Sequence, residues 1–381
     1  MTRKYKISVL PGDGIGREVI PEAVAVMKAV ASSTDGLELE LHEFECGGQY
    51  FLKNKLEWSE AAETFTKTEA DAILLGGVGA KDADGMIVRR PDGNMAGYGV
   101  VIGLRQELDL YANVRPVRLY EGVHTPLAGK NPQDIDMVIV RENTEGLYIP
   151  ARGRITGREE GDLAVDLRVI TASGSERVSR FAFDLAMDRN GAPIDGKKRV
   201  TCVDKSNLLA GCKLFRESFN KIGESYPDVV KDYAYVDAWT LLAIQKPEQY
   251  DVVVAPNEFG DIISDLGGAI QGGLGISPSG NIGDQHAMFE PVHGSAPDIA
   301  GRNIANPLAA ILSTAMMFEW LGTKHSDKAL TSAAEQIRRA VKEALGTSNI
   351  RTPDLCVGEW SKVKPSTTQE AAAEVIKRIT S

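Results

Sequence analysis

Short apolar segments, each about the length of a buried strand, recur along most of the chain. They span residues 6–10, 71–75, 136–140, 199–203, 233–236 and 251–255, and a half-buried strand is predicted at 37–41. Amphipathic segments separate most of them, and in residues 17–30 the apolar side chains recur at helical spacing. Because strands and helices alternate in this way, the chain is predicted to fold as an α/β protein with a largely parallel sheet.

The alternation is interrupted at residues 151–171, where charged and apolar residues alternate instead. The charged residues there are Arg152, Arg154, Arg158, Glu159, Glu160 and Asp162, and the apolar ones are Ile155, Leu163, Val165, Leu167 and Val169. This pattern predicts a polar β-hairpin or arm that leaves the α/β body. Such an arm is either exposed to solvent or paired with a second subunit.

Composition narrows the class of protein. The chain has 381 residues and a net charge of −10, and its basic residues are dispersed, so nothing in its charge favours binding to nucleic acid or to an anionic membrane. The most apolar helical segment, 307–321, is shorter than a membrane span. The first strand begins too close to Met1 for a secretory signal. The widely spaced cysteines predict reduced thiols and a cytoplasmic location; they are Cys46, Cys202, Cys212 and Cys356.

Asp261 and Asp265 are four residues apart in an apolar, helix-like segment that a glycine-rich tract follows. On a helix, residues at this spacing share a face, so the two carboxylates can converge on one point. A hard divalent cation with oxygen ligands is the natural partner for such a pair. The more common alternative is a solvated acidic face, which the apolar neighbours Phe259, Ile262 and Ile263 argue against.

Glycines at positions 12, 14 and 16 follow the first strand, as in a dinucleotide-binding loop. The Rossmann pattern GxGxxG fails, because position 17 is Arg17. A tight strand-to-helix turn explains these glycines more simply.

Arg105, Arg115 and Arg141 lie beside predicted strands. Arginine stays charged and binds carboxylates with two parallel hydrogen bonds, so a cluster of three suits a di- or tricarboxylate substrate. Each one alone is more commonly part of a surface ion pair. Arg141 directly follows an apolar strand, at the end of the strand where α/β sheets bind ligands.

Tyr148 and Lys205 are candidate acid and base groups. Lys205 follows the strand predicted at 199–203, and a lysine beside a bound cation gives up its proton more readily. The alternatives are a tyrosine in the core and a lysine in solvent at a strand end. Asp237, which follows the strand predicted at 233–236, is a candidate third metal ligand, and a helix N-cap is the competing interpretation.

Residues 290–301 form a predicted loop with many backbone donors, followed by Asn306 and Pro307, a good start for an apolar helix. A loop that leads to a helix N-terminus suits the phosphates of a nucleotide. Asp298 in this loop offers a carboxylate to a ribose diol.

Together these motifs resemble the β-decarboxylating dehydrogenase family of isocitrate, 3-isopropylmalate, homoisocitrate and tartrate/D-malate dehydrogenases. The resemblance covers PGDGIG (11–16), LRQELDLYANVRP (104–116), VRENTEGLY (140–148), VDKSN (203–207), NEFGDIISD (257–265), SPSGNIGD (277–284) and HGSAPDIAGRNIANP (293–307). It implies a three-layer α/β/α isopropylmalate-dehydrogenase-like fold, not a Rossmann fold, in which two domains share a mixed sheet and a β arm protrudes. The large cofactor-binding domain comprises 1–110 and 272–381. The small domain, 111–271, carries the dimer interface and an arm at about 150–171.

The resemblance also implies roles for individual residues. Tyr148 and Lys205 correspond to the acid/base pair. The substrate site comprises Arg105, Arg115, Arg141, Val101 and Ile102, and the Mg²⁺ or Mn²⁺ ligands are Asp237, Asp261 and Asp265. The cofactor loop contributes His293, Gly294, Ser295, Ala296, Asp298, Ile299 and Asn306. In the family, the equivalents of Lys205 and Asp237 come from the partner subunit, so a homodimer is expected, with further assembly left open.

Cofactor and substrate follow from the same resemblance. NADP-type relatives similar to the isocitrate enzymes carry Lys-Tyr where this chain has Asp298 and Ile299, so NAD is expected. Isocitrate enzymes hold the extra carboxylate with serine and asparagine, where this chain has Gly99 and Val101, and homoisocitrate enzymes can place an arginine at the position of Ile102. The apolar residues here favour 3-isopropylmalate.

Other functions remain open at this point. Isocitrate or homoisocitrate is the alternative substrate, followed by tartrate or D-malate, because segment 81–100 departs from the family pattern. A non-catalytic regulatory subunit is a different class of function, but such subunits typically lose part of the metal or acid/base set, which this chain keeps. A phosphate-binding relative of similar fold would not explain the three arginines.

Overall fold

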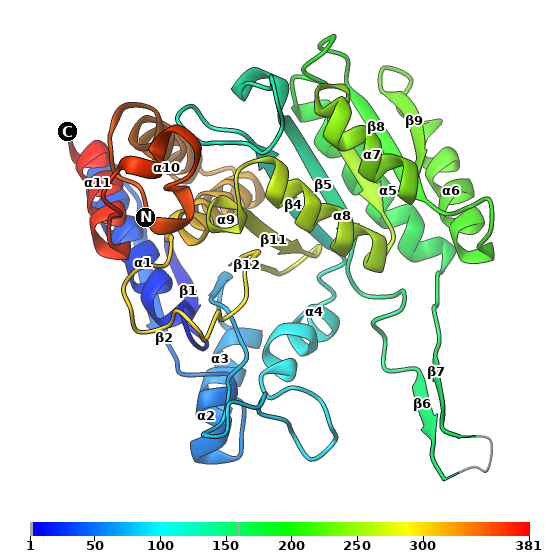
Figure 1. The fold of residues 1–381 in the computed structure, drawn as a ribbon, viewed down its shortest axis with the longest axis horizontal. Coiled ribbons are helices and arrows are strands. Elements are labelled where there is room, and N and C mark those ends of the chain that lie inside the picture. Colours follow the sequence, from blue (N-terminus) through cyan, green and yellow to red (C-terminus); the bar gives the residue numbers. More distant parts are fainter. Residues whose placement is uncertain (1–2, 158–160) are drawn as a thin grey trace. The chain divides into compact units, whose positions relative to one another are not determined.

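The computed structural model describes residues 3–157 and 161–381. Helices and strands alternate along these residues, so the predicted mixed α/β class is confirmed (Figure 1). The chain divides into two compact units. Unit 1 comprises Met1–Leu110, Leu119–Ala128 and Gly268–Ser381, and unit 2 comprises Tyr111–Arg118 and Gly129–Gly267. The domain limits expected from the sequence stay a prediction.

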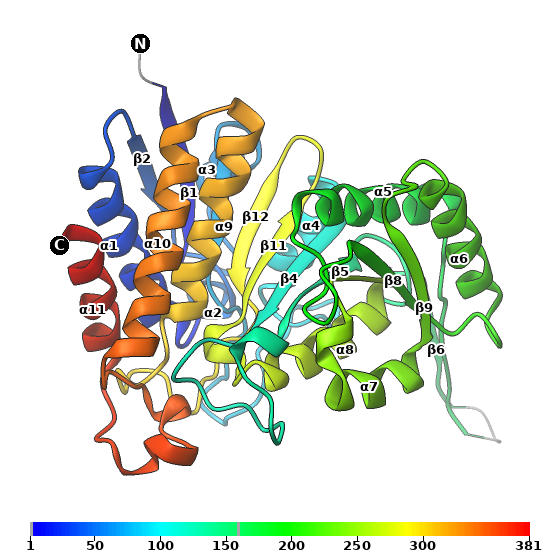
Figure 2. The ribbon, with the colours of Figure 1, turned by 90° about the horizontal axis from the view of Figure 1, so that it is seen from above.

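The strands of unit 1 have the order β2-β1-β3-β12-β11 (Figure 2). Their bounds are β1 Lys4–Leu10, β2 Glu38–Glu43, β3 Ala72–Leu75, β11 Pro278–Ile282 and β12 Ala287–Pro291. β1 runs parallel to β2 and β3, β12 runs parallel to β3, and β11 and β12 are antiparallel. Strands from both ends of the chain therefore contribute to one layer.

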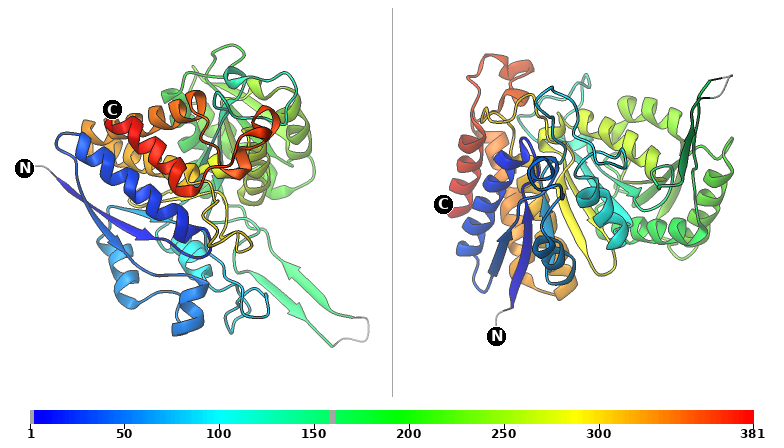
Figure 3. Two further views of the ribbon diagram at one scale, coloured as in Figure 1. Left: turned by 60° about the vertical axis from the view of Figure 1, so that its left-hand side comes forward. Right: turned by 90° about the horizontal axis from the view of Figure 1, so that it is seen from below.

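The helices of unit 1 also bring distant parts of the sequence together. They are α1 Gly16–Ser33, α2 Gly48–Asn54, α3 Glu60–Thr68, the π-helix η1 Gly99–Gly103, α4 Leu104–Glu107, α9 Leu308–His325, α10 Lys328–Thr347 and α11 Thr368–Thr380. Figure 3 shows α11, in red, beside α1, in blue, and the two helices are in contact. α9 is buried over most of its length, as its apolar sequence predicts. None of the helices in the described ranges is long and apolar enough to cross a membrane.

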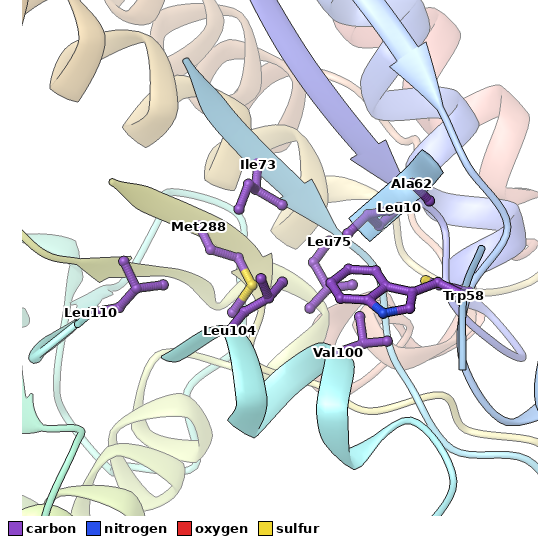
Figure 4. Packing of buried hydrophobic residues seen from close by; sticks show 10 residues of the cluster. Leu10, Trp58, Ala62, Ile73, Leu75, Val100, Leu104, Leu110 and Met288 are labelled. Atoms are coloured by element: carbon purple, nitrogen blue, oxygen red, sulfur yellow. The ribbon is translucent and has the colours of Figure 1, made fainter. Parts of the chain in front are cut away.

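An apolar cluster in unit 1 fixes the segment that includes η1 and α4. Val100 and Leu104 from this segment pack with side chains of β1, β3 and β12 and with Trp58 (Figure 4). The full set is Leu10, Cys46, Trp58, Ala62, Ile73, Leu75, Val100, Leu104, Leu110 and Met288. Burial of this cluster therefore helps to hold the segment in place.

The strands of unit 2 have the order β4-β5-β10-β8-β9. Their bounds are β4 Ala112–Arg118, β5 Asp136–Glu142, β8 Arg199–Asp204, β9 Val230–Tyr235 and β10 Val252–Ala255. β4 is antiparallel to β5, and the other neighbouring strands are parallel. Arg141, near the end of β5, pairs with Ala255, the last residue of β10. The chain therefore passes from Ala255 into the next helix directly beside Arg141.

The α-helices of this half of the chain, within its described residues, are α5 Ala172–Asp188, α6 Ala210–Gly223, α7 Val236–Gln245 and α8 Asn257–Ile270, of which α8 ends just beyond the unit boundary. The strand predicted to reach Val236 ends at Tyr235, and Val236 begins α7. Short 3-10 helices lie at Pro132–Asp134, Pro247–Gln249, Leu274–Ile276, Pro353–Leu355 and Gly358–Lys362.

The predicted arm is a two-stranded antiparallel hairpin of β6, Arg152–Ile155, and β7, Leu163–Asp166. Figure 1 shows it as a narrow extension. Its apolar side chains, including those of Ile155 and Leu163, are exposed. The three residues of its charged pattern at 158–160 lie outside the described residues. Pairing of the arm with a second subunit stays a prediction.

Candidate active site

The acidic pair of the sequence motif lies on α8, as predicted. Asp261 and Asp265 are one helical turn apart, and both contact the guanidinium of Arg115. The Arg115 Nη1 atom lies 3.1 Å from Asp265 Oδ1, and its Nη2 atom lies 3.4 Å from Asp261 Oδ1. The two carboxylates therefore face the same point, which a helix with a solvated acidic face does not require.

A second guanidinium, that of Arg141, donates to the same Asp261 oxygen through Nη1. Its Nε and Nη2 atoms both donate to Asn257 Oδ1, at 3.0 and 2.7 Å. The side chains of Arg141 and Arg115 are only 4% and 9% exposed. Because burying an unpaired charge is costly, these two cations need carboxylates beside them. In unit 2 the acidic pair of α8 supplies those carboxylates.

Two glycines let α8 lie this close to the sheet. A Cβ atom added at Gly260 would lie 2.6 Å from the Cβ atom of Arg141. One added at Gly267 would lie 2.6 Å from Val117 Cγ2. The two glycines are seven residues apart, which places them on one face of a helix. The glycines of this motif therefore bring the helix to the strands that carry the arginines.

Tyr148 completes this cluster. Its hydroxyl donates to Asp261 Oδ2 at 3.2 Å, and the Arg141 guanidinium lies 5.5 Å from the centre of its ring. Burial and then the negative charge of Asp261 raise the pKa of Tyr148. The phenol therefore keeps its proton at neutral pH, as a proton donor must. The prediction that Tyr148, Arg115, Arg141, Asp261 and Asp265 act together is consistent with this geometry.

The donor atoms at Asp261 and Asp265 fit a hard divalent cation. Both ligand groups are carboxylates, and the Asp265 side chain is 62% exposed, so a cation can reach it. Burial raises the pKa of Asp265, and the neighbouring Arg115 opposes that shift. Asp237, the third predicted ligand, lies elsewhere. No group of three or more His, Cys, Asp or Glu side chains that could hold a metal is found among residues 3–157 and 161–381 of this single chain.

Lys205 and Asp237 form a separate pair in unit 2. The Lys205 ammonium donates to Asp237 Oδ1, and this hydrogen bond lowers the pKa of Asp237. Asp237 is the second residue of α7, whose N-cap is Tyr235, so the helix N-cap interpretation is wrong. The two residues assigned to a partner subunit by resemblance thus lie together on one chain, in a pair distinct from the Asp261 cluster.

Arg105, the third predicted arginine, lies on α4 in unit 1. Its Nη2 atom donates to Glu290 Oε1 at 2.8 Å, and both side chains are largely buried. The Glu290 oxygen also accepts from Asn281 Nδ2 at 2.7 Å. The Nε atom of Arg105 is buried and has no hydrogen-bond partner within the described part of the chain. A buried donor is therefore left unsatisfied at this position.

Val101 and Ile102, the residues expected beside the C3 substituent, lie in the π-helix η1. Val101 is partly buried against the apolar cluster of unit 1, and Ile102 is also partly exposed. π-helical turns are rare and are frequent at functional sites, because the wider turn redirects side chains. Arg105 lies three residues after Ile102, in the helix α4 that directly follows η1.

The predicted cofactor loop packs against the glycine turn that follows β1. Ser295 O accepts a hydrogen bond from Ile15 N at 2.8 Å, and a Cβ atom at Gly14 would lie 2.0 Å from the same oxygen. Gly12 and Gly14 both have positive φ angles, of 73° and 55°. The opening glycines therefore permit a tight turn and a close backbone approach. This agrees with the sequence argument against a Rossmann loop.

Other residues of this loop are partly fixed by neighbours. His293 Nδ1 lies 3.0 Å from Gly294 O, its Nε2 atom is buried and without a partner in the described ranges, and burial lowers its pKa. The Asp298 carboxylate is 84% exposed and lies 2.8 Å from Lys81 Nζ. The helix α9 begins at Leu308, one residue after Pro307. Asn306 Oδ1 accepts a hydrogen bond from Leu308 N at 3.0 Å. Ala296 and Ile299 flank Asp298 in the same turn, where Ile299 N donates to Ala296 O.

Sequence reasoning missed the residues that hold the arginines. Asn257 accepts hydrogen bonds from Arg141. Asn113 and Ser264 accept hydrogen bonds from Arg115, and Glu290 accepts one from Arg105. A signal was present for two of them. Asn257 is four residues before Asp261 on the same helix, and Asn113 is two residues before Arg115 on the same strand face. Glu290 carried no such signal, because 185 residues separate it from Arg105.

Comparisons with known proteins agree with this architecture. A model of the family described as isocitrate/isopropylmalate dehydrogenase matches residues 6–375. The 3-isopropylmalate dehydrogenase of Bifidobacterium longum (strain NCC 2705) is 43% identical over 359 residues, which are 93% of this chain and 97% of that protein. The 3-isopropylmalate/3-methylmalate dehydrogenase of Methanocaldococcus jannaschii is 42% identical over 377 residues, 98% and 99% of the two chains. The structure of isocitrate dehydrogenase from Methylococcus capsulatus has a TM-score of 0.83 at 36% identity and covers 99% of this chain and 100% of that chain.

Proposed function

Because the chain belongs to the isocitrate/isopropylmalate dehydrogenase family and is an enzyme of the β-decarboxylating class, we propose that it oxidises and decarboxylates a 3-substituted (2R)-malate with NAD. The proposed substrate is 3-isopropylmalate. One arrangement carries the proposal. The buried guanidiniums of Arg115 and Arg141 contact the carboxylates of α8, and the Tyr148 hydroxyl donates to one of the same carboxylates, that of Asp261.

These internal ion pairs explain how a dicarboxylate would be recognised. Arg115 and Arg141 each contact Asp261 in this chain. A cation that binds Asp261 and Asp265 would withdraw those carboxylates from the guanidiniums. The guanidiniums would then require new anionic partners, and substrate carboxylates supply them with favourable bidentate geometry. Arg105, with a buried and unpaired Nε, would hold a carboxylate of the same substrate.

The reaction would then use the two predicted acid/base groups. Lys205, in its neutral amine form, would take the proton of the C2 hydroxyl, and bound NAD would supply the acceptor for the hydride that leaves C2. The bond from C3 to its carboxylate then breaks, CO₂ leaves, and the electron pair remains as an enolate. Tyr148, whose raised pKa keeps it protonated, donates a proton to C3. A bound Mg²⁺ or Mn²⁺ at Asp261 and Asp265 would acidify the hydroxyl and offset the developing negative charge.

NAD is proposed as the cofactor because of Asp298. A carboxylate accepts hydrogen bonds from a ribose 2′-hydroxyl and repels the 2′-phosphate of NADP. Asp298 is exposed in the loop that also contains His293, Gly294, Ser295 and Ile299. It is therefore accessible to a nucleotide.

The choice of 3-isopropylmalate depends on the apolar pair Val101 and Ile102. Neither side chain offers a hydrogen bond to the third carboxylate of isocitrate or homoisocitrate, and leaving such a carboxylate unpaired costs binding energy. Two relatives, from B. longum and M. jannaschii, are named for their action on 3-isopropylmalate. Isocitrate and homoisocitrate are the alternatives, and D-malate and tartrate follow them.

Steady-state kinetics with NAD and Mg²⁺ test this proposal. We expect kcat/KM for 3-isopropylmalate to exceed the values for isocitrate, homoisocitrate, D-malate and tartrate. A higher kcat/KM for isocitrate than for 3-isopropylmalate would reject the proposed substrate and leave the reaction class intact.

A further inference from the structure

Segment 81–100, which departs from the family pattern, has its own small fold in unit 1. Isolated antiparallel bridges join Lys81 to Ile87 and Arg89 to Met95. Backbone hydrogen bonds from Val88 N to Ala80 O and from Ala96 N to Val88 O, at 3.0 and 2.9 Å, join the bridged stretches of the segment. The apolar cluster inside it contains only Ala80, Val88 and Ala96, against which Phe51 packs. A cluster this small cannot fix the segment by hydrophobic burial alone.

One carboxylate, that of Glu57, binds the segment at three places. Glu57 Oε1 accepts from Gly97 N at 2.6 Å, and Oε2 accepts from Gly99 N at 3.1 Å. Arg90 Nη1 donates to Oε2, also at 3.1 Å. The Glu57 side chain is only 11% exposed. Hydrogen bonds to an ionised, largely buried acceptor are among the stronger ones in proteins.

The backbone at Glu57 is itself fixed. Gly47 N donates to Glu57 O at 2.8 Å, and Trp58, the next residue, pairs with Cys46 in an isolated bridge and is buried in the apolar cluster. The backbone that carries the Glu57 carboxylate is therefore held in place. Through its hydrogen bonds the carboxylate links this backbone to Gly97 and Gly99, at the start of η1.

A side chain at position 99 would displace the Glu57 carboxylate from its present position. A Cβ atom at Gly99 would lie 2.3 Å from Glu57 Oε2. Position 99 corresponds by resemblance to a serine that holds the extra carboxylate in isocitrate enzymes. In this chain both the amide and the side-chain space of that position are taken by Glu57.

The π-helix η1 begins at this anchored glycine. Val100 N and Val101 N both donate to Gly97 O, at 3.1 and 3.2 Å, so the first turn depends on the position of Gly97. Gly97 N and Gly99 N are the two amides that Glu57 binds. The position of the first turn of η1, and with it that of Val101 and Ile102, therefore depends on the same carboxylate.

We propose that Glu57 is a positioning residue for substrate selection, which holds Gly97 and Gly99 so that Val101 and Ile102 present an apolar surface to the C3 substituent. This inference rests on the proposed function for the identity of the substrate. It adds a residue that does not touch the substrate and acts through the segment it anchors.

The test compares Glu57→Gln with the wild-type enzyme on 3-isopropylmalate and on D-malate, which has no C3 substituent. Glutamine has nearly the same shape, but it loses the charge that binds Arg90, and its NH₂ group cannot accept from an amide. We expect the ratio of the two kcat/KM values to fall about tenfold, through a higher KM for 3-isopropylmalate, with the values for D-malate within about twofold of wild type. Glu60→Gln is the matched control, because Glu60 is exposed and three residues away.

A second measurement needs no activity. We expect trypsin to cleave Glu57→Gln after Lys81 or Arg89 faster than it cleaves wild type, with Glu60→Gln unchanged. Glu57→Asp, which keeps the charge and loses reach, serves if the glutamine variant does not fold. Two outcomes would overturn the inference. Faster cleavage with an unchanged ratio of the two kcat/KM values would show that Glu57 has only a structural role. Unchanged cleavage would show that Glu57 does not anchor the segment.

Failure of the proposed function has a different signature. If wild type prefers isocitrate, the proposed substrate is wrong, and the ratio of isocitrate to D-malate then reports on Glu57 in the same way. If wild type oxidises none of these acids, the proposed function fails, and unchanged cleavage of the variant would still refute the anchoring by Glu57.

Discussion

Asp261 receives hydrogen bonds from three side chains of the candidate site, those of Arg115, Arg141 and Tyr148. The sequence indicates each of them from its own motif: the two arginines because they lie beside predicted strands, and Tyr148 as a candidate acid or base. It does not predict their partners. Asn257, Asn113 and Ser264 complete the arginine contacts, and only the spacings of Asn257 from Asp261 and of Asn113 from Arg115 offered a signal.

Asp298 supports a prediction about cofactor choice. Asp298→Ser removes the charge that would repel a 2′-phosphate and leaves Lys81, now 2.8 Å from Asp298, without its carboxylate partner. We expect the ratio of kcat/KM for NADP to that for NAD to rise by about tenfold or more, which corresponds to about 1.4 kcal/mol. Steady-state kinetics with both cofactors measure it, with Asp35→Ser as an exposed control. An unchanged ratio would contradict the role given to Asp298.

At the scale of elements, the helices and strands with strong patterns are where the sequence places them, and the errors are local. The strand predicted to end at Val236 gives way to α7 one residue earlier, which moves Asp237 from a strand end into the first turn of a helix. The π-helix at Gly99–Gly103 was not predicted, and its contacts with Glu57 and with the apolar cluster involve residues far from it in the sequence. Tertiary contacts override local preference at such places.

The contact between α8 and the sheet depends on glycine. In Gly267→Ala the new methyl group would lie 2.6 Å from Val117 Cγ2, so the helix or the strand must shift. We expect a loss of about 1–3 kcal/mol in the free energy of unfolding, measured by urea denaturation. Gly346→Ala in α10 is the matched control, because its nearest contact would be at 3.5 Å. That variant is expected to gain up to about 1 kcal/mol from helix propensity, and equal effects of the two changes would refute the packing argument.

The hydrogen bond from β1 to the start of α10 gives a pH-dependent stability. Tyr5 OH donates to Asp327 Oδ2 at 2.8 Å, and burial and then this bond raise the pKa of Tyr5 to about 12. A raised pKa means that the folded state holds the proton longer than the unfolded state. The contribution is therefore complete below pH 10 and is lost as the pH rises from 10 to 12.

Tyr5→Phe tests this bond. We expect the variant to lose about 1 kcal/mol of unfolding free energy at pH 8, and the difference from wild type to shrink above pH 10. Tyr250→Phe is the comparison, because burial and the charge of Asp232 raise the pKa of Tyr250 to about 12 without a contribution from such a bond. A difference between wild type and Tyr5→Phe that stays constant up to pH 12 would contradict the assignment.

At the scale of the whole molecule, the α/β class and the arm are predicted from the sequence, and the order of the strands is not. Unit 1 contains residues from both chain ends. The crossing near residue 110 is not rich in Gly or Pro, and the glycine-rich tract near residue 268 begins inside α8, so neither crossing looks like a separate flexible linker. The resemblance to a family gave a discontinuous domain that composition alone did not.

Lys205 and Asp237 form a pair apart from Asp261, which supports the expectation that each active site combines two chains. A heterodimer of Lys205→Met and Asp261→Asn chains tests it, purified through two different tags after co-expression. One of its two sites would contain both intact residues, so we expect about half of the wild-type activity per dimer, whereas each homodimer is inactive. A heterodimer as inactive as the two homodimers would show that Lys205 and Asp261 act within one chain.

Oxidative decarboxylation of a 3-substituted malate, the reaction proposed for this chain, forms NADH and CO₂ together. NADH is followed by absorbance alongside CO₂ release, with 3-isopropylmalate, NAD and Mg²⁺, before and after addition of EDTA. We expect equal amounts of NADH and CO₂, and loss of both with EDTA. NADH formation without CO₂, or turnover that EDTA leaves unchanged, would contradict the proposed reaction.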